Sequence, residues 1–244
     1  MTSLATRYES GEWAEVWAEI RQLGPVPHAR QTEVEDVARS TMKRAGIQIG
    51  RIVEVLLALG FEPASSGIPV VTPPPCDVSE RVAKLELLLG PLPAALKASM
   101  GEIGAVSLLG DCPAIGLYYH QPPPARVSTM PPGSDYPDPL WLPCVDQLES
   151  EWDERGHDLL ELSTSSFEFA PDELHKANIS GAAHDIWLPD THADPVLLGV
   201  VGRPSITVVE YLRLSVAWGG FPGYSFGLAP RPRALEQLTS SPLF

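Results

Sequence analysis

Three side chains late in the chain alternate in a pattern that suits a metal ion. Asp190, His192 and Asp194 offer two carboxylates and an imidazole, and His175 and His184 come shortly before them. Oxygen and nitrogen ligands of this kind bind zinc or manganese. Prolines enclose the segment, however, and such a sequence is also typical of a polar turn. We therefore favour a solvent-exposed loop and keep a metal-assisted hydrolase as an alternative.

Two further motifs resemble catalytic sites. Ser225 lies in a Gly-x-Ser-x-Gly pattern, but a hydrolase nucleophile of this type needs a downstream acid and histidine. No Asp and no His follows it. Cys144 precedes His157 and His175, so a thiol–imidazole pair is arithmetically possible, although a lone cysteine beside apolar residues is usually part of the core. We expect no catalytic residue, and the absence of nucleotide-binding and zinc-binding motifs predicts no cofactor.

The strongest charge feature is the stretch from Asp146 to Glu173. It holds ten carboxylates and one basic residue, in a chain with a formal charge of -14. A solvated helix face would explain it, and so would a docking surface for a basic protein, with tryptophans as anchors. The residues that we expect to bind a partner are Trp141, Glu149, Glu151, Trp152, Asp153, Glu154, Asp158, His175 and Asn178.

Two compact blocks combine glycine with polar or aromatic side chains. His175–Gly181 places donors and acceptors beside a glycine, and Trp218–Gly223 combines bulky rings with backbone freedom. Each block is either a structural turn or a recognition loop. The turn is the favoured interpretation for both.

Composition excludes several classes of partner. Lys and Arg together number 17 against 31 for Asp and Glu, so we expect neither nucleic acid nor an anionic membrane, both of which require clustered cations. The first residues lack the apolar segment of a signal peptide, and three cysteines without a Cys-x-x-Cys pair give no disulfide framework. These features predict a cytoplasmic protein whose partner is another protein, and they leave the oligomeric state open.

Helical periodicity dominates the first 62 residues, which hold only two of the 26 prolines. Ser10 is a suitable N-cap for a first helix, in which Trp13 and Trp17 share one apolar face. Thr32 with Glu35 predicts a capping box for a second helix. Neither helix can bury its apolar face alone, so both must pack on other elements.

Strand and helix signals alternate irregularly after residue 63. A final helix is expected to begin at Ser205 or Thr207 and to end near Trp218, and the residues after Phe226 to be loosely held. The segments with strand character are 105–109, 115–119, 167–169 and 185–188. The order predicts an α+β fold, with a mixed or antiparallel sheet packed by helices and an N-terminal helical pair. We divide the chain into a helical segment, 1–62, packed on an α+β domain, 63–244.

One segment resembles a known superfamily. Leu92–Met100, followed by Ile103–Val106 and Gly110, resembles the SUKH superfamily, which includes yeast cell-wall assembly regulators and many bacterial immunity proteins. The shared mark is a Leu-Pro pair that opens a helix, followed by a glycine turn and a strand. The resemblance implies an α+β fold over 63–244 and non-enzymatic binding of a partner protein. A second likeness, to uncharacterised bacterial proteins, spans nearly the whole chain and implies no activity.

These observations favour a bacterial protein-binding module without enzymatic activity. Its most concrete form is an immunity-type protein that neutralises a basic toxin with the acidic surface. Besides the hydrolase, a structural subunit that self-associates through the face of Trp13 and Trp17 remains an alternative.

Overall fold

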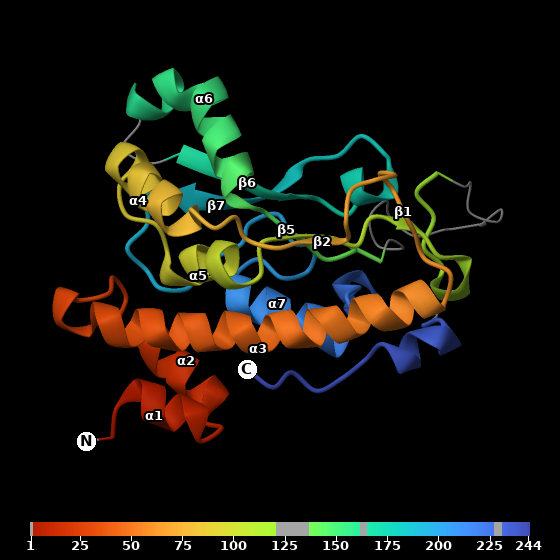
Figure 1. Cartoon of the computed structure of the whole chain (residues 1–244), viewed down its shortest axis with the longest axis horizontal. Helices are drawn as coiled ribbons and strands as arrows, with labels where there is room; N and C mark the ends of the chain where they lie inside the picture. Colours follow the sequence, from red (N-terminus) through yellow and green to blue (C-terminus); the bar gives the residue numbers. More distant parts are fainter. Residues whose placement is uncertain (1, 121–136, 162–164, 227–230) are drawn as a thin grey trace.

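The computed structural model describes residues 2–120, 137–161, 165–226 and 231–244, without the side chains of 155–161 and 226. One long helix, α3 (Gln31–Ala58), runs along the molecule, and the other elements pack against it (Figure 1). The short helices α1 (Leu4–Glu9) and α2 (Trp13–Gln22) lie on one side of α3, and α5 (Ala94–Glu102) and the strands lie on the other. The fold is α+β with an N-terminal helical pair, as the sequence predicts.

The N-terminal helices differ in detail from the sequence-based expectation. The helix α1 comes first, capped by Ser3. Ser10, the expected N-cap, is instead the C-cap of α1, and α2 begins at Trp13 after Glu12, which makes no side-chain capping bond. The capping box of Thr32 and Glu35 is wrong, because α3 already begins at Gln31 without a side-chain cap. The Glu35 carboxylate instead accepts a hydrogen bond from Lys97 on α5, 2.9 Å away, so a tertiary contact has replaced the expected local one.

The apolar face of α2 is buried inside the protein. Trp17 is fully buried, and its indole nitrogen donates to the Thr41 hydroxyl of α3 at 2.9 Å. The Trp13 ring packs partly buried against the core, beneath the Arg44 guanidinium. The tryptophan face that we considered for self-association is therefore occupied by α3.

The strands form three small antiparallel sheets. Two of the sheets have two strands each, and in the third β3 is the central strand of the order β2-β3-β5. The strands are β1 (Glu62–Pro63), β2 (Val71–Thr72), β3 (Ala105–Ser107), β4 (Gly110–Asp111), β5 (Trp141–Leu142), β6 (Ser165–Pro171) and β7 (Ala183–Leu188). The strand expected at 115–119 is wrong: a 3-10 turn, η2 (Pro113–Ile115), leads into Gly116 with φ 72°, which turns the chain.

Three further helices are described. They are α4 (Val78–Leu89), α6 (Val145–Glu161) and α7 (Val208–Ala217). The start of α7 is confirmed, since Thr207 and Glu210 form a reciprocal capping box. Buried side chains from before and after residue 63, such as Met42 and Leu212, belong to one continuous hydrophobic core.

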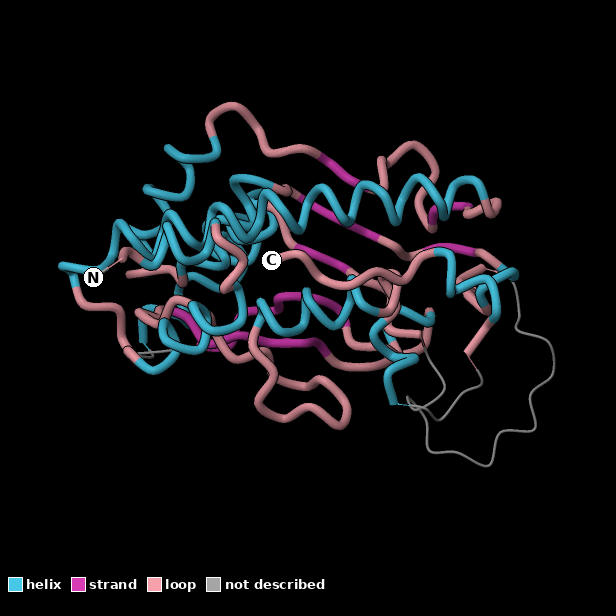
Figure 2. Tube along the Cα trace, turned by 90° about the horizontal axis from the view of Figure 1, so that it is seen from below, coloured by secondary structure: helices cyan, strands magenta, loops and turns pink. Residues whose placement is uncertain are grey.

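The expectation of a loose C-terminal tail is wrong for residues 231–244. The 3-10 turn η5 (Arg233–Gln237) buries Leu235, and the ring of Phe244 is 2% exposed. The Gln48 side chain of α3 donates to the Ser241 carbonyl and accepts from the Leu243 amide, both at 2.9 Å. The final segment therefore lies along α3, near the middle of the molecule (Figure 2).

Candidate functional site

The outer face of the β2-β3-β5 sheet forms the floor of a cleft of about 270 Å³. Because side chains alternate between the faces of a strand, the buried Val106 and Leu142 lie toward the core while Ser107 and Trp141 face the cleft, and all four residues contribute to its lining. The other lining residues are Pro63, Ala64, Ser65, Ile68, Pro69, Val70, Thr72, Ala105, Leu109, Tyr119, Cys144 and Gln147. The cleft is mainly apolar, and Ile68 at its rim is 60% exposed.

The Tyr119 wall of this cleft is held by hydrogen bonds to its main chain. The buried Asp111 carboxylate accepts from the Tyr119 amide at 2.8 Å and from the His120 amide at 3.2 Å. From the other direction, the Asn178 side-chain amide donates to the Tyr119 carbonyl at 3.3 Å. Asn178, which we expect to contact a partner, is exposed and supports a cleft wall through this hydrogen bond.

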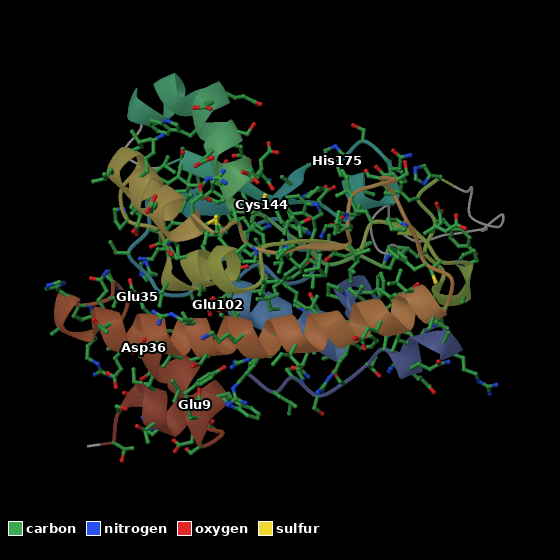
Figure 3. All side chains as sticks on the ribbon, viewed as in Figure 1. Glu9, Glu35, Asp36, Glu102, Cys144 and His175 are labelled. Atoms are coloured by element: carbon green, nitrogen blue, oxygen red, sulfur yellow. The ribbon has the colours of Figure 1, made fainter. Side chains whose placement is uncertain are left out.

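The acidic helix α6 begins at one end of the cleft. Cys144 and Gln147 line the cleft, and Val145 between them is the first residue of α6. Figure 3 shows Cys144 near the centre of the molecule, close to the start of this helix. Gln147 also donates to the Glu168 carbonyl of β6 at 3.2 Å, which fixes the helix against the strand. The carboxylates of α6 therefore extend away from the cleft mouth.

These carboxylates fall into two groups. Asp146 and Glu149 form ion pairs with Arg81 of α4, and the guanidinium lowers the pKa of Glu149. Glu151 accepts a hydrogen bond from the Glu168 amide at 3.4 Å. Asp153 and Glu154 are exposed, as is the paired Asp146, so three of the five described carboxylate side chains of α6 face solvent. Trp152 is half-buried beside them, and the Asp158 side chain lies outside the described residues.

The His175 loop is a structural turn. The Asp172 carboxylate accepts from the His175 amide at 2.9 Å and from the Ala182 amide at 2.7 Å, which closes the loop at its base. The His175 ring lies 2.7 Å from the Ala182 carbonyl oxygen through Nδ1. In Figure 3 His175 lies well away from Cys144 and from α6. It is exposed but does not belong to the acidic surface.

Sequence reasoning missed a buried polar network under this loop. The Lys176 ammonium lies 2.5 Å from Asp138 Oδ1 and donates to the Tyr211 hydroxyl at 3.1 Å. That hydroxyl donates to Asp138 Oδ2 at 2.9 Å. His184 Nε2 lies 3.5 Å from Asp138 Oδ1, at the edge of the network. The Lys176 side chain is 0% exposed and that of Asp138 is 5% exposed.

The network is electrostatically complementary. Burial alone would raise the pKa of Asp138, but the Lys176 ammonium, together with the neighbouring His184, holds that pKa well below its usual range. Burial, together with the Asp138 carboxylate, raises the pKa of Tyr211 far above its usual value. Asp138 lies three residues before Trp141, and Lys176 lies two residues before Asn178, so the network is close in sequence to two residues that line or support the cleft.

The three residues considered for a metal do not converge. Asp190 Oδ1 accepts from the His192 amide at 2.9 Å and lies 2.6 Å from the ring Nδ1, which makes a local polar turn. Asp194 instead accepts from the Val209 amide of α7 at 3.0 Å and lies 3.3 Å from the Arg21 guanidinium. Across the described part of the chain, no cluster of His, Cys, Asp and Glu has the geometry of a metal site.

The remaining motifs are explained by the fold. Ser225 lies in a 3-10 turn, η4 (Pro222–Phe226), rather than between a strand and a helix, and its buried hydroxyl has no hydrogen-bond partner among the described residues. The Trp218–Gly223 block ends α7, and the Gly219 φ of 64° and Gly220 φ of 91° make the turn. Cys144 lines the cleft, away from His175, and the side chain of His157 lies outside the description.

The chain was compared with family models, curated proteins and solved structures. No family model, no curated protein and no solved structure matches the chain. Among the described residues, no helix has both the length and the apolar character needed to cross a membrane. The cleft and its acidic helix are therefore interpreted from their own chemistry.

Proposed function

We propose that this protein is a non-enzymatic protein-binding module that receives a basic partner at the cleft and along α6. The observation that carries the proposal is the direct junction of the two surfaces. Trp141 and Ile68 line an apolar cleft, and the acidic helix begins three residues after Leu142, within the cleft lining. An apolar anchor beside a charged flank is a common design of protein interfaces.

The cleft and the acidic helix would contribute differently to binding. A tryptophan in a pocket, shielded from water once the partner is bound, supplies most of the affinity in many interfaces. Exposed carboxylates such as Asp153 and Glu154 steer a basic partner and raise the association rate more than the affinity. A basic partner with a protruding apolar side chain fits this combination.

The SUKH resemblance gives the proposal a specific form. At the segment that carries it, α5 follows Pro93, Gly104 adopts a φ of 81°, and β3 begins at Ala105. A Cβ at Gly104 would lie 2.2 Å from the Thr72 carbonyl oxygen, so this turn requires glycine. The helix, glycine turn and strand support an immunity-type role, in which the acidic surface covers the basic active site of a toxin.

The test compares variants of the two surfaces in binding to one captured partner. The tagged protein is used to isolate partners from its host, and the affinity of the recombinant partner is then measured by calorimetry. We expect Ile68→Asp to weaken binding on the order of 10-fold or more. We expect Glu154→Lys to slow association, with an effect that fades above about 0.1 M salt because exposed charges are screened.

Matched controls separate this site from general charge effects. Glu54→Lys on α3 makes the same charge reversal at another exposed position and should leave the association rate unchanged. Circular dichroism confirms that each variant is folded. A partner whose affinity is the same for the native protein and for Ile68→Asp would overturn the proposal, as would the absence of any stoichiometric partner.

A further inference from the structure

The cleft over the β2-β3-β5 sheet has an uncharged lining in a strongly acidic protein. None of the described residues that line it is Asp, Glu, Lys, Arg or His, while the whole chain has a formal charge of -14. The exposed carboxylates of Asp153 and Glu154 lie outside the lining, on α6, which leads away from β5 (Figure 1). A ligand that complements both regions has an uncharged part for the cleft and a basic part for the helix.

The polar side chains of this lining can donate hydrogen bonds. The indole N–H of Trp141 can only donate, and the hydroxyls of Thr72, Ser107 and Tyr119 can donate as well. All four residues are partly or fully exposed. Acceptors are scarcer, because the lining holds no described carboxylate and the main-chain carbonyl of Val70 already accepts from the Ser107 amide at 2.9 Å. These walls suit a ligand that is rich in carbonyl groups and poor in N–H groups.

The floor of the cleft is the face of a sheet rather than its edge. The central strand β3 is paired with β2 on one side and with β5 on the other, so its backbone groups are already used. A segment that lies on this face cannot pair with β3 as a further strand, and its own buried N–H groups would need other partners. Proline has no N–H group, and a polyproline II helix makes no internal hydrogen bonds.

We propose that the partner enters the cleft with a proline-rich segment in the polyproline II conformation, and that basic residues beside this segment lie along α6. Tyr119 and Trp141 bring aromatic residues into the lining from two separate parts of the chain, and aromatic-lined grooves bind such segments in other proteins. The carbonyls of the segment accept from the donors of the lining, and its preformed conformation lowers the entropy cost of binding. The inference rests on the proposed function, because it names the part of the partner that fills the same cleft.

The test measures the binding of labelled peptides to the full chain by fluorescence anisotropy. The probe has a centre of leucine and proline with arginines at both ends, so that a basic flank is present in either orientation. We expect a peptide with alanine in place of every proline to bind about 10-fold more weakly, because it must be ordered on binding. Serine in place of the arginines should weaken binding at low salt, and the difference should fade as salt rises.

Variants of the protein assign the peptide to the cleft. Tyr119→Ala should weaken binding of the proline peptide about 10-fold. This variant is expected to fold, because the hydrogen bonds that hold Tyr119 involve its main-chain amide and carbonyl, which alanine retains. Trp187→Ala removes a half-exposed ring of β7 outside the cleft lining and should leave the affinity unchanged.

The outcomes separate this inference from the proposed function. Equal affinities for the proline and alanine peptides would overturn the inference, and so would binding of the proline peptide that is unchanged in Tyr119→Ala. If the native chain binds no peptide while Ile68→Asp still weakens the captured partner, the inference fails and the proposed function stands. If Ile68→Asp leaves the affinity of the captured partner unchanged, both fail.

Discussion

Two ion-pair clusters in this protein have similar composition and opposite environments. Lys176 and Asp138 meet in the interior, where their side chains are 0% and 5% exposed. Arg81 meets Asp146 and Glu149 on the surface between α4 and α6, where the Asp146 side chain is 70% exposed. Each cluster joins a cation to carboxylates from another segment of the chain. The difference in solvent access decides what each contributes.

The charged groups of the interior cluster are shielded from water, so water cannot replace a lost partner. If one member is removed, the other remains as a buried charge, which is far more costly than the loss of the pair itself. At the surface, water and salt replace a lost partner, so an exposed pair contributes little. Both clusters look alike when only charged residues are counted in the sequence, but their contributions to the free energy of unfolding differ because one is buried and the other is not.

The largest effect is expected for Lys176→Met. The Asp138 carboxylate would stay buried without its ammonium partner, and we expect the free energy of unfolding to fall by about 3–5 kcal/mol. Urea unfolding followed by circular dichroism measures this change. In the double variant with Asp138→Leu no unpaired charge remains buried, so most of the lost free energy of unfolding should be recovered. If Lys176→Met lowers the free energy of unfolding by no more than the loss of an exposed ion pair does, the comparison is contradicted.

A smaller effect, dependent on pH, is expected at Asp194. Burial raises the pKa of Asp194 to about 6, although the Val209 amide and Arg21 partly oppose the shift. The unfolded chain has a pKa near 3.9, so the stability that this group contributes is present below about pH 4 and is lost as the pH rises through 6. Relative to the native protein, Asp194→Asn should therefore gain about 3 kcal/mol between pH 4 and pH 7.

The Asp194 experiment consists of urea unfolding of both proteins at several pH values. Other carboxylates titrate in the same range, and subtracting the two curves removes their common contribution. Parallel curves for the two proteins would show that Asp194 ionises normally. The solvent access of this ion pair is intermediate between those of the two clusters, because the buried Asp194 carboxylate contacts a partly exposed Arg21.

The smallest effect is expected for Arg81→Met. Because this cluster is exposed to water, the free energy of unfolding should fall by no more than about 1 kcal/mol at low salt, and the difference should shrink as salt rises. The same change uncovers Asp146 and Glu149, so association with a basic partner should become faster. A loss of stability as large as that of Lys176→Met would remove the distinction between the two clusters.

Local signals in the sequence predict helices best where the cap is local. The start of α7 was predictable because Thr207 and Glu210 lie three residues apart and cap the helix without help from elsewhere. The strand expected at 115–119 is wrong because Gly116 turns the chain after η2, and the Asp111 carboxylate, eight residues before Tyr119, accepts a hydrogen bond from the Tyr119 amide. Propensity alone cannot show such a contact.

The residues of the candidate site also fall into those that the sequence can indicate and those that it cannot. Trp141 and the acidic helix were predictable, because composition and charge are local properties. Tyr119 and Ile68 were not, since a cleft wall is defined by what faces it. Lys176 was the least predictable residue, because its partner Asp138 is 38 positions away and its sequence neighbours give no sign of burial.

The hold of Gln48 on the C-terminal segment has a consequence for the order of folding. The hydrogen bonds from this side chain reach residues more than 190 positions later in the chain. At ribosomal rates of about 5–20 residues per second, α3 is complete on the order of ten seconds or more before those partners are synthesised. Contacts of such long sequence separation slow folding. We therefore expect the contact between Gln48 and the C-terminal segment to be among the last to form.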